Sequence, residues 1–119
     1  LPARAGAKHA YHAAAALLSN GTVALFDAAL ELAGGDEKVE RAFLGLLEGT
    51  LENLRRLGVP DALTGPALRG DAEVLEGHLE QLDSDQHALY GPLTARMLEL
   101  ARRRGALTSE QVERLRQIL

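Results

Sequence analysis

The stretch ALTGPALRGD, residues 62–71, separates two long helical patterns from two or three shorter ones. Two glycines and a proline break the helical period within it, and Arg69 and Asp71 place opposite charges beside the breaks. Two interpretations are open. The stretch is a simple turn, in which Gly65 ends one helix and Asp71 caps the next, or it is a loop that holds binding groups in a fixed position.

The composition favours one soluble, all-α domain. The chain has 119 residues, of which 46% are hydrophobic and 25% charged. Strand-forming residues are few, and alanine, leucine, glutamate and arginine are abundant. The net charge of −4 gives no reason to expect nucleic acid, and the arginines at 102–104 favour a solvated helix end. The absence of cysteine excludes disulfides and thiolate chemistry.

No membrane or export signal is expected. The most apolar segment, residues 13–33, is interrupted by polar side chains and falls short of the roughly 20 apolar residues that span a bilayer. No signal peptide is apparent, so we expect a cytoplasmic protein. The chain begins at Leu1 rather than Met, which suggests a piece of a longer protein.

Glycines and capping residues predict the helices. We expect one long helix from about 7 to 33, ended by Gly34–Gly35, and a second from a cap at Asp36 to about 57. Further helices are predicted from Asp71 to about 82, from 84 or 85 to 105, and from a capping box at Thr108. The predicted apolar faces comprise Leu18, Leu25, Ala29 and Leu32; Val39, Phe43, Leu46, Leu47, Leu51 and Leu54; and Val74, Leu75, Leu79 and Leu82.

Polar side chains along these helices offer chemistry. Lys8, His12 and Ser19 fall within about 60° on one stripe of the first helix, which either faces water or lines a pocket. Lys8 and His12 are spaced to exchange protons, and Arg69 can clamp a carboxylate or phosphate. His78 lies among leucines, where a structural histidine is the alternative. No spacing supports a metal site at these histidines or at Asp71.

Several motifs taken together resemble a known family. They are Lys8-x-x-Tyr11-His12-Ala13-Ala14-Ala15 with Ser19-Asn20; Asn53; Leu63-Thr64-Gly65-Pro66-x-x-Arg69-Gly70-Asp71; and His78-Leu79 with Tyr90. They resemble domain of unknown function 2520, the C-terminal domain of Rossmann-like predicted oxidoreductases, over residues 8–104. Neither of the two longest motifs suffices alone.

The resemblance implies an all-α helical bundle like the C-terminal domain of 6-phosphogluconate dehydrogenase, covering residues 1–119. It implies a preceding Rossmann domain, absent from this chain, that binds most of NAD(P), and it implies a homodimer. Hydroxyacid-dehydrogenase relatives have a catalytic lysine in a Lys-x-x-x-Asn pair. Here His12 replaces the asparagine, so the proton-exchange role of Lys8 is carried over and that of His12 is our inference.

From the resemblance we expect the matched residues to converge on one cleft facing the nucleotide domain. Lys8 and His12 would be catalytic, Arg69 would hold a small anionic substrate, and Asp71 would orient Arg69 or His78. The expected substrate-binding set is Ser19, Asn20, Asn53, Thr64, Gly65, Arg69, Asp71 and His78.

Three function classes follow from the sequence. The first is the substrate-binding and dimerising half of an NAD(P)-dependent oxidoreductase, inactive without its nucleotide domain. The second is a helical dimerisation module without a catalytic role. The third is an adaptor that binds a partner peptide in an apolar groove. An intact polar cluster favours the first.

Overall fold

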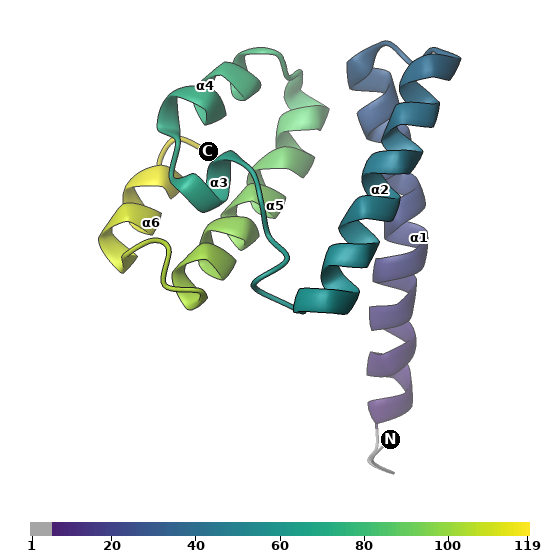
Figure 1. Ribbon diagram of the computed structural model, residues 1–119, viewed down its shortest axis with the longest axis horizontal. Helices are drawn as coiled ribbons and strands as arrows, with labels where there is room; N and C mark the ends of the chain where they lie inside the picture. Colours follow the sequence, from purple (N-terminus) through teal and green to yellow (C-terminus); the bar gives the residue numbers. More distant parts are fainter. Residues whose placement is uncertain (1–5) are drawn as a thin grey trace. The chain divides into compact units, whose positions relative to one another are not determined.

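The structure is a computed structural model that describes residues 6–119, and within that range it is helical without strands, as predicted. In chain order the helices are α1 (Ala7–Ala33), α2 (Glu37–Leu57), α3 (Pro66–Arg69), α4 (Ala72–Glu80), α5 (Ser84–Arg103) and α6 (Ser109–Arg116) (Figure 1). The chain divides into two compact units, Leu1–Gly45 and Leu46–Leu119. The single domain over 1–119 remains a prediction.

Helix α1 has the predicted bounds. It ends at Gly34, whose φ of 92° is a left-handed conformation that suits glycine, and the Gly34 amide donates to the carbonyl of Glu31. The predicted apolar face of α1 is not covered within this chain: α1 has no buried residue. Leu18 is 73% exposed and Leu32 is 47% exposed.

Exposed apolar side chains on α1 are not confined to one narrow face. Leu17 and Leu18 are neighbours in sequence, lie about 100° apart around the axis, and are 78% and 73% exposed. Such a broad exposed apolar surface is normally covered by other protein or by lipid. By length and composition alone α1 could cross a membrane, contrary to the sequence argument that polar interruptions make the segment too short.

Helix α2 begins and ends where the sequence indicates. The carboxylate of Asp36 accepts a hydrogen bond from the amide of Val39 at 2.8 Å, as an N-cap does. The helix stops at Leu57 before Gly58, which has a φ of 67°. Burial of its apolar face is also not found: α2 has no buried residue, and Leu46 is 68% exposed.

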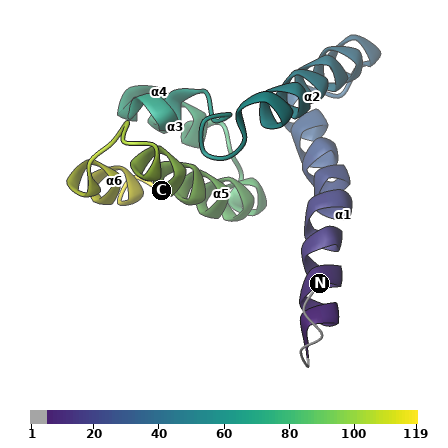
Figure 2. The same cartoon turned by 60° about the horizontal axis from the view of Figure 1, so that its bottom comes forward.

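The hydrophobic core lies in the unit Leu46–Leu119. Leu75 of α4 and Leu98 of α5 are at most 1% exposed, and Leu107, Val112 and Leu115 close the core around α6. Helix α5 packs against α3 and α6, and α3 packs against α4 (Figures 1 and 2). Of the predicted apolar face at Val74, Leu75, Leu79 and Leu82, only Leu75 is buried; Leu79 and Leu82 are half-buried, and Val74 is 37% exposed.

The stretch 62–71 differs from a simple turn because it contains a helix. Gly65 begins α3 rather than ending a helix, and Pro66 occupies the first turn, where its missing N–H costs nothing. Gly70 ends α3 with a φ of 64°. Asp71 then caps α4, as predicted, by accepting from the amide of Val74 at 3.2 Å.

Capping boxes begin the last two helices. The side chain of Thr108 accepts from the amide of Gln111 and the Gln111 side chain accepts from the amide of Thr108, as predicted. Asp83 and Gln86 form the same arrangement at α5, so that helix begins at Ser84 as expected. Pro92 lies inside α5. These caps fix the starts of the helices that carry the core.

Candidate functional site

A cavity of about 210 Å³ opens among α3, α4 and α5; we call it the Tyr90 cavity. Its walls are mostly apolar. Its lining residues are Thr64, Pro66, Ala67, Leu75, His78, Tyr90, Leu93, Thr94 and Met97. The short helix α3 brings Thr64 and Pro66 to this cavity because Gly65 turns the chain sharply between them. Two of the residues predicted to bind substrate, Thr64 and His78, therefore line one cavity.

The polar side of the Tyr90 cavity is a hydrogen-bonded pair. Nδ1 of His78 lies 2.8 Å from the phenol oxygen of Tyr90, and the two rings meet edge to face at 86° with centroids 5.9 Å apart. Burial raises the pKa of the Tyr90 phenol above its ordinary 10.0, while a side-chain hydrogen bond from Thr94 acts in the opposite direction. Tyr90 is therefore a neutral hydroxyl near pH 7, able both to donate and to accept.

A second cavity, of about 260 Å³, adjoins the first, and we call it the Asn53 cavity. Thr64 and Met97 line both cavities. The other lining residues are Thr50, Asn53, Leu54, Val59, Pro60, Ala62, Leu63 and Leu100. Asn53, Thr64 and His78, which come from three separate motifs, thus line two adjoining cavities.

The loop before Thr64 is fixed by an arginine whose role the sequence did not reveal. Nη1 of Arg104 donates to the carbonyl of Leu63 at 2.9 Å and to that of Asp61 at 3.3 Å, and Nε lies 3.8 Å from the Asp61 carboxylate. The run at 102–104 indicated only a solvated helix end. Arg104 differs because it reaches 41 residues back along the chain, a contact that no local pattern reports.

The other predicted site residues of this unit lie at the junction of α3 and α4. Gly65 is the N-cap of α3, and Arg69 is exposed at its last residue. The Asp71 carboxylate accepts from the backbone of Val74. None of these three residues lines the Tyr90 cavity or the Asn53 cavity.

Four predicted residues belong to the unit Leu1–Gly45. Because α1 is one continuous helix, Lys8, His12 and Ser19 share one side of it, as the spacing indicates, and Asn20 lies beside them. All four side chains are exposed. The structure brings this group together along α1, and brings Asn53, Thr64 and His78 together in the other unit.

Tyr90 and Met97 are among the lining residues that were not predicted as site residues. Tyr90 appears in the resemblance without a role, and Met97 reads as an ordinary apolar position of a helix. The spacing of His78 and Tyr90, 12 residues apart on different helices, gives no local signal of their contact. Among residues 6–119, no group of three or more His, Asp or Glu side chains comes together in a way that could hold a metal ion.

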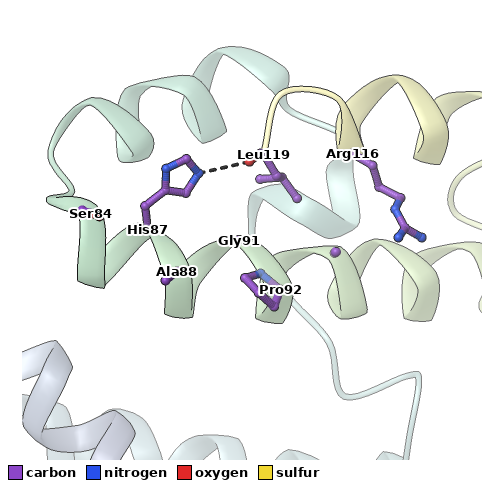
Figure 3. A pocket seen from close by; sticks show the side chains of 8 residues that line it. Ser84, His87, Ala88, Gly91, Pro92, Arg116 and Leu119 are labelled. Atoms are coloured by element: carbon purple, nitrogen blue, oxygen red, sulfur yellow. Dashed lines mark hydrogen bonds between the residues drawn. The ribbon is translucent and has the colours of Figure 1, made fainter.

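A larger and more open cavity, of about 690 Å³, lies between α5, α6 and the end of the chain; we call it the His87 groove (Figure 3). Nε2 of His87 lies 3.0 Å from the backbone oxygen of Leu119, and Arg116 stands at the far side (Figure 3). No predicted site residue lines this groove. Its size therefore does not make it the stronger candidate.

Comparison with known proteins gives one match. The family described as Domain of unknown function (DUF2520) matches residues 1–97, which contain every predicted site residue and nearly all the lining of the two adjoining cavities. Neither the curated proteins nor the solved structures give a significant match.

Proposed function

Because the chain belongs to the family described as Domain of unknown function (DUF2520), we propose that it is the helical substrate-binding and dimerisation domain of an NAD(P)-dependent oxidoreductase. In this proposal a Rossmann domain of the same protein binds most of the nucleotide. The helical chain supplies substrate contacts and acts as an enzyme only together with that domain. We propose a cytoplasmic enzyme that binds neither nucleic acid nor membrane.

One observation carries the proposal. Asn53, Thr64 and His78 are separated by up to 25 positions, yet they line two adjoining cavities of one compact unit. A module that serves packing alone gains nothing from gathering an amide, a hydroxyl and an imidazole around apolar cavities. A concave, mainly apolar site with a few polar groups is the usual form of a small-molecule site.

The proposed roles follow the chemistry of each side chain. Lys8 and His12 would exchange a proton with a substrate hydroxyl or imine, and NAD(P) held by the Rossmann domain would supply the hydride chemistry. Ser19, Asn20, Asn53 and Thr64 hydrogen-bond the substrate. Arg69 holds its anionic group, with Asp71 as its neighbour at the start of α4.

The proposed dimer would cover apolar surface that the chain leaves open. Leu17, Leu18 and Val23 of α1 are at least 70% exposed. A helix of 27 residues is about 40 Å long, enough to run along a second copy or along the nucleotide domain. Burying such side chains is the main driving force of association.

The test is activity in the product of the complete gene. NADPH and NADH oxidation is followed at 340 nm with a panel of small keto acids, once for the unaltered protein and once each for Lys8→Ala and His12→Ala. The proposal expects at least about a hundredfold loss of kcat in either variant, the usual size of an acid–base contribution. A variant at Lys38, an exposed lysine of α2, serves as the control. Unchanged kcat in both Lys8→Ala and His12→Ala would remove the proposed roles.

A second function has a specific observation in its favour. The broad exposed apolar surface of α1 suits a structural dimerisation or partner-binding module without catalysis. That alternative expects association without any nucleotide-dependent activity in the complete protein. It also expects substitutions at Asn53 or Thr64 to leave every function of the protein unchanged.

A further inference from the structure

The Tyr90 cavity has the size and the wall of a site for a ring. Its volume is about 210 Å³, and an apolar protein cavity of about 150 Å³ suffices to bind benzene. The apolar wall is made of Pro66, Ala67, Leu75, Leu93 and Met97. Of these, Leu75 and Ala67 are buried members of the hydrophobic core, so the core itself forms the inner wall.

The outer wall can adapt to a ligand. Met97 is 37% exposed and lines both adjoining cavities. An unbranched, flexible thioether changes rotamer easily to fit an irregular partner. A ligand can therefore place one part in the Tyr90 cavity and continue past Met97 and Thr64 into the Asn53 cavity.

The phenol of Tyr90 retains hydrogen-bonding capacity. A phenol hydroxyl donates once and accepts twice. His78 engages one of those three positions at 2.8 Å, and the Thr94 side chain lies close enough to lower the pKa of the phenol. Because the imidazole either accepts from the phenol or donates to it, depending on its tautomer, a remaining position can receive a ligand hydroxyl or serve a ligand carbonyl.

The charge of the cavity excludes an anionic group inside it. No lysine or arginine lines the Tyr90 cavity or the Asn53 cavity. An ionised carboxylate placed against these apolar walls would lose its hydration without gaining a lysine or arginine partner. The anionic group assigned to Arg69 therefore has to stay outside the cavities.

We propose that the Tyr90 cavity binds the apolar part of the substrate, an aromatic ring or branched alkyl group that carries a hydroxyl or carbonyl oxygen bound by Tyr90. This inference rests on the proposed function only in calling the ligand a substrate. The Asn53 cavity takes the continuation of the same molecule, and the amide of Asn53 binds a polar group on it. The substrate class is thus an aryl or branched-alkyl hydroxy or oxo compound.

The test uses three probes with the same ring: toluene, benzyl alcohol and benzoate. Each is titrated into the 119-residue chain, and amide shifts are followed by ¹H–¹⁵N NMR. The inference expects toluene and benzyl alcohol to shift the amides of Thr64, His78 and Thr94, with benzyl alcohol binding about fivefold to tenfold more tightly because of one added hydrogen bond. Benzoate should bind more weakly than toluene.

Two variants and one control test whether the probes bind in the Tyr90 cavity. Tyr90→Phe keeps the ring and removes the hydroxyl, so benzyl alcohol should bind no better than toluene. Met97→Trp fills the partly exposed opening, so toluene and benzyl alcohol should both lose binding, and this variant decides the matter should Tyr90→Phe prove unfolded. Tyr11→Phe makes the same change on α1, where Tyr11 is 60% exposed, and should alter nothing.

Three results would overturn the inference: benzoate binding as tightly as benzyl alcohol, shifts away from the cavity, or tight benzyl alcohol binding that survives Tyr90→Phe. The experiment contains no nucleotide. If this chain binds benzyl alcohol but the complete protein binds no nucleotide, the cavity is a binding site and the proposed oxidoreductase function is wrong. If the complete protein binds nucleotide but this chain does not bind benzyl alcohol, the proposed function stands and the inferred binding site is wrong.

Discussion

The imidazole Nδ1 of His78 in α4 lies 2.8 Å from the phenol oxygen of Tyr90 in α5. This contact joins two helices that begin at separate caps, Asp71 and Asp83. It also forms the polar edge of a cavity whose other walls are mainly hydrocarbon. The same pair therefore contributes to the stability of the unit and to the chemistry of the candidate site.

Removing the Tyr90 hydroxyl should destabilise the chain measurably. Tyr90→Phe deletes the hydrogen bond to His78 and leaves the apolar ring in place, so we expect a loss of about 1 kcal/mol in the free energy of unfolding. Urea denaturation followed by circular dichroism measures this loss. Tyr11→Phe, at a side chain that is 60% exposed, should stay within about 0.5 kcal/mol. Equal effects of the two substitutions would contradict the structural role of the pair.

Two glycine substitutions should have opposite signs. Gly70 has a φ of 64°, and a Cβ there would lie 2.9 Å from Cδ2 of Leu107, so Gly70→Ala should destabilise by more than about 1 kcal/mol. Gly77 lies inside α4 with no heavy atom within 4 Å of a Cβ. Gly77→Ala should therefore stabilise by about 0.5–1 kcal/mol, since alanine favours helix.

Thermal unfolding of the two glycine variants measures both predicted changes in stability. A rise in Tm for Gly77→Ala beside a fall for Gly70→Ala is the expected pattern. A Gly70→Ala variant as stable as the unaltered chain would mean that the α3–α4 junction is not held in this conformation.

The pKa of Glu99 should be low and should depend on Arg102. Hydrogen bonding to the Arg102 guanidinium, with one bond of 2.9 Å from Nε, holds the Glu99 pKa at about 2, below the ordinary 4.5. A pKa lowered by folding means that ionised Glu99 favours the folded chain above pH 4.5 and that this contribution is lost as the pH falls towards 2. The pair is exposed, so the contribution is small and screened by salt.

Carboxyl ¹³C NMR gives that pKa directly. In Arg102→Gln the Glu99 pKa should rise towards its ordinary value, and molar sodium chloride should move it the same way in the unaltered chain. An Arg102→Gln variant with an unchanged Glu99 pKa would show that Arg102 is not the cause.

Surface leucines of α1 should control association. We expect the chain to sediment as a dimer at about 50 μM, a concentration well above the dissociation constants of specific protein pairs. Leu17→Glu combined with Val23→Glu should give monomers, since each adds a charge to a side chain that is at least 70% exposed and would be buried in the dimer. Ser19→Glu adds the same charge to the polar stripe and is the matched control.

Vesicles distinguish this association from membrane binding. Co-sedimentation of the unaltered chain with phosphatidylcholine vesicles would show that α1 enters lipid and would contradict the proposed cytoplasmic dimer. A chain that stays monomeric without vesicles would equally contradict it.

Helix boundaries could be predicted because their causes are local. Asp36, Asp71 and Thr108 cap the residues that directly follow them, and glycine ends α1 at the predicted residue. Burial could not be predicted in the same way. Leu18 and Leu98 both stand in apolar helical patterns, yet one is 73% exposed and the other fully buried. Helices α3 and α6 pack against α5, whereas α1 has no buried residue.

The candidate site was predictable only in part, for the same reason. His78, Thr64 and Asn53 were found through motifs, and the structure gathers them around two adjoining cavities. The contact of His78 with Tyr90 and the support of the loop by Arg104 join residues that are 12 and 41 positions apart. Such contacts depend on how helices pack, which no short pattern encodes.

Nucleotide binding tests the central claim most directly. Calorimetry with NADPH and NADH is run on the product of the complete gene and, under the same conditions, on this 119-residue chain. The account predicts binding by the complete protein and none by the helical chain alone. Binding by neither protein, or equal binding by both, would contradict the division of labour between a nucleotide domain and this helical domain.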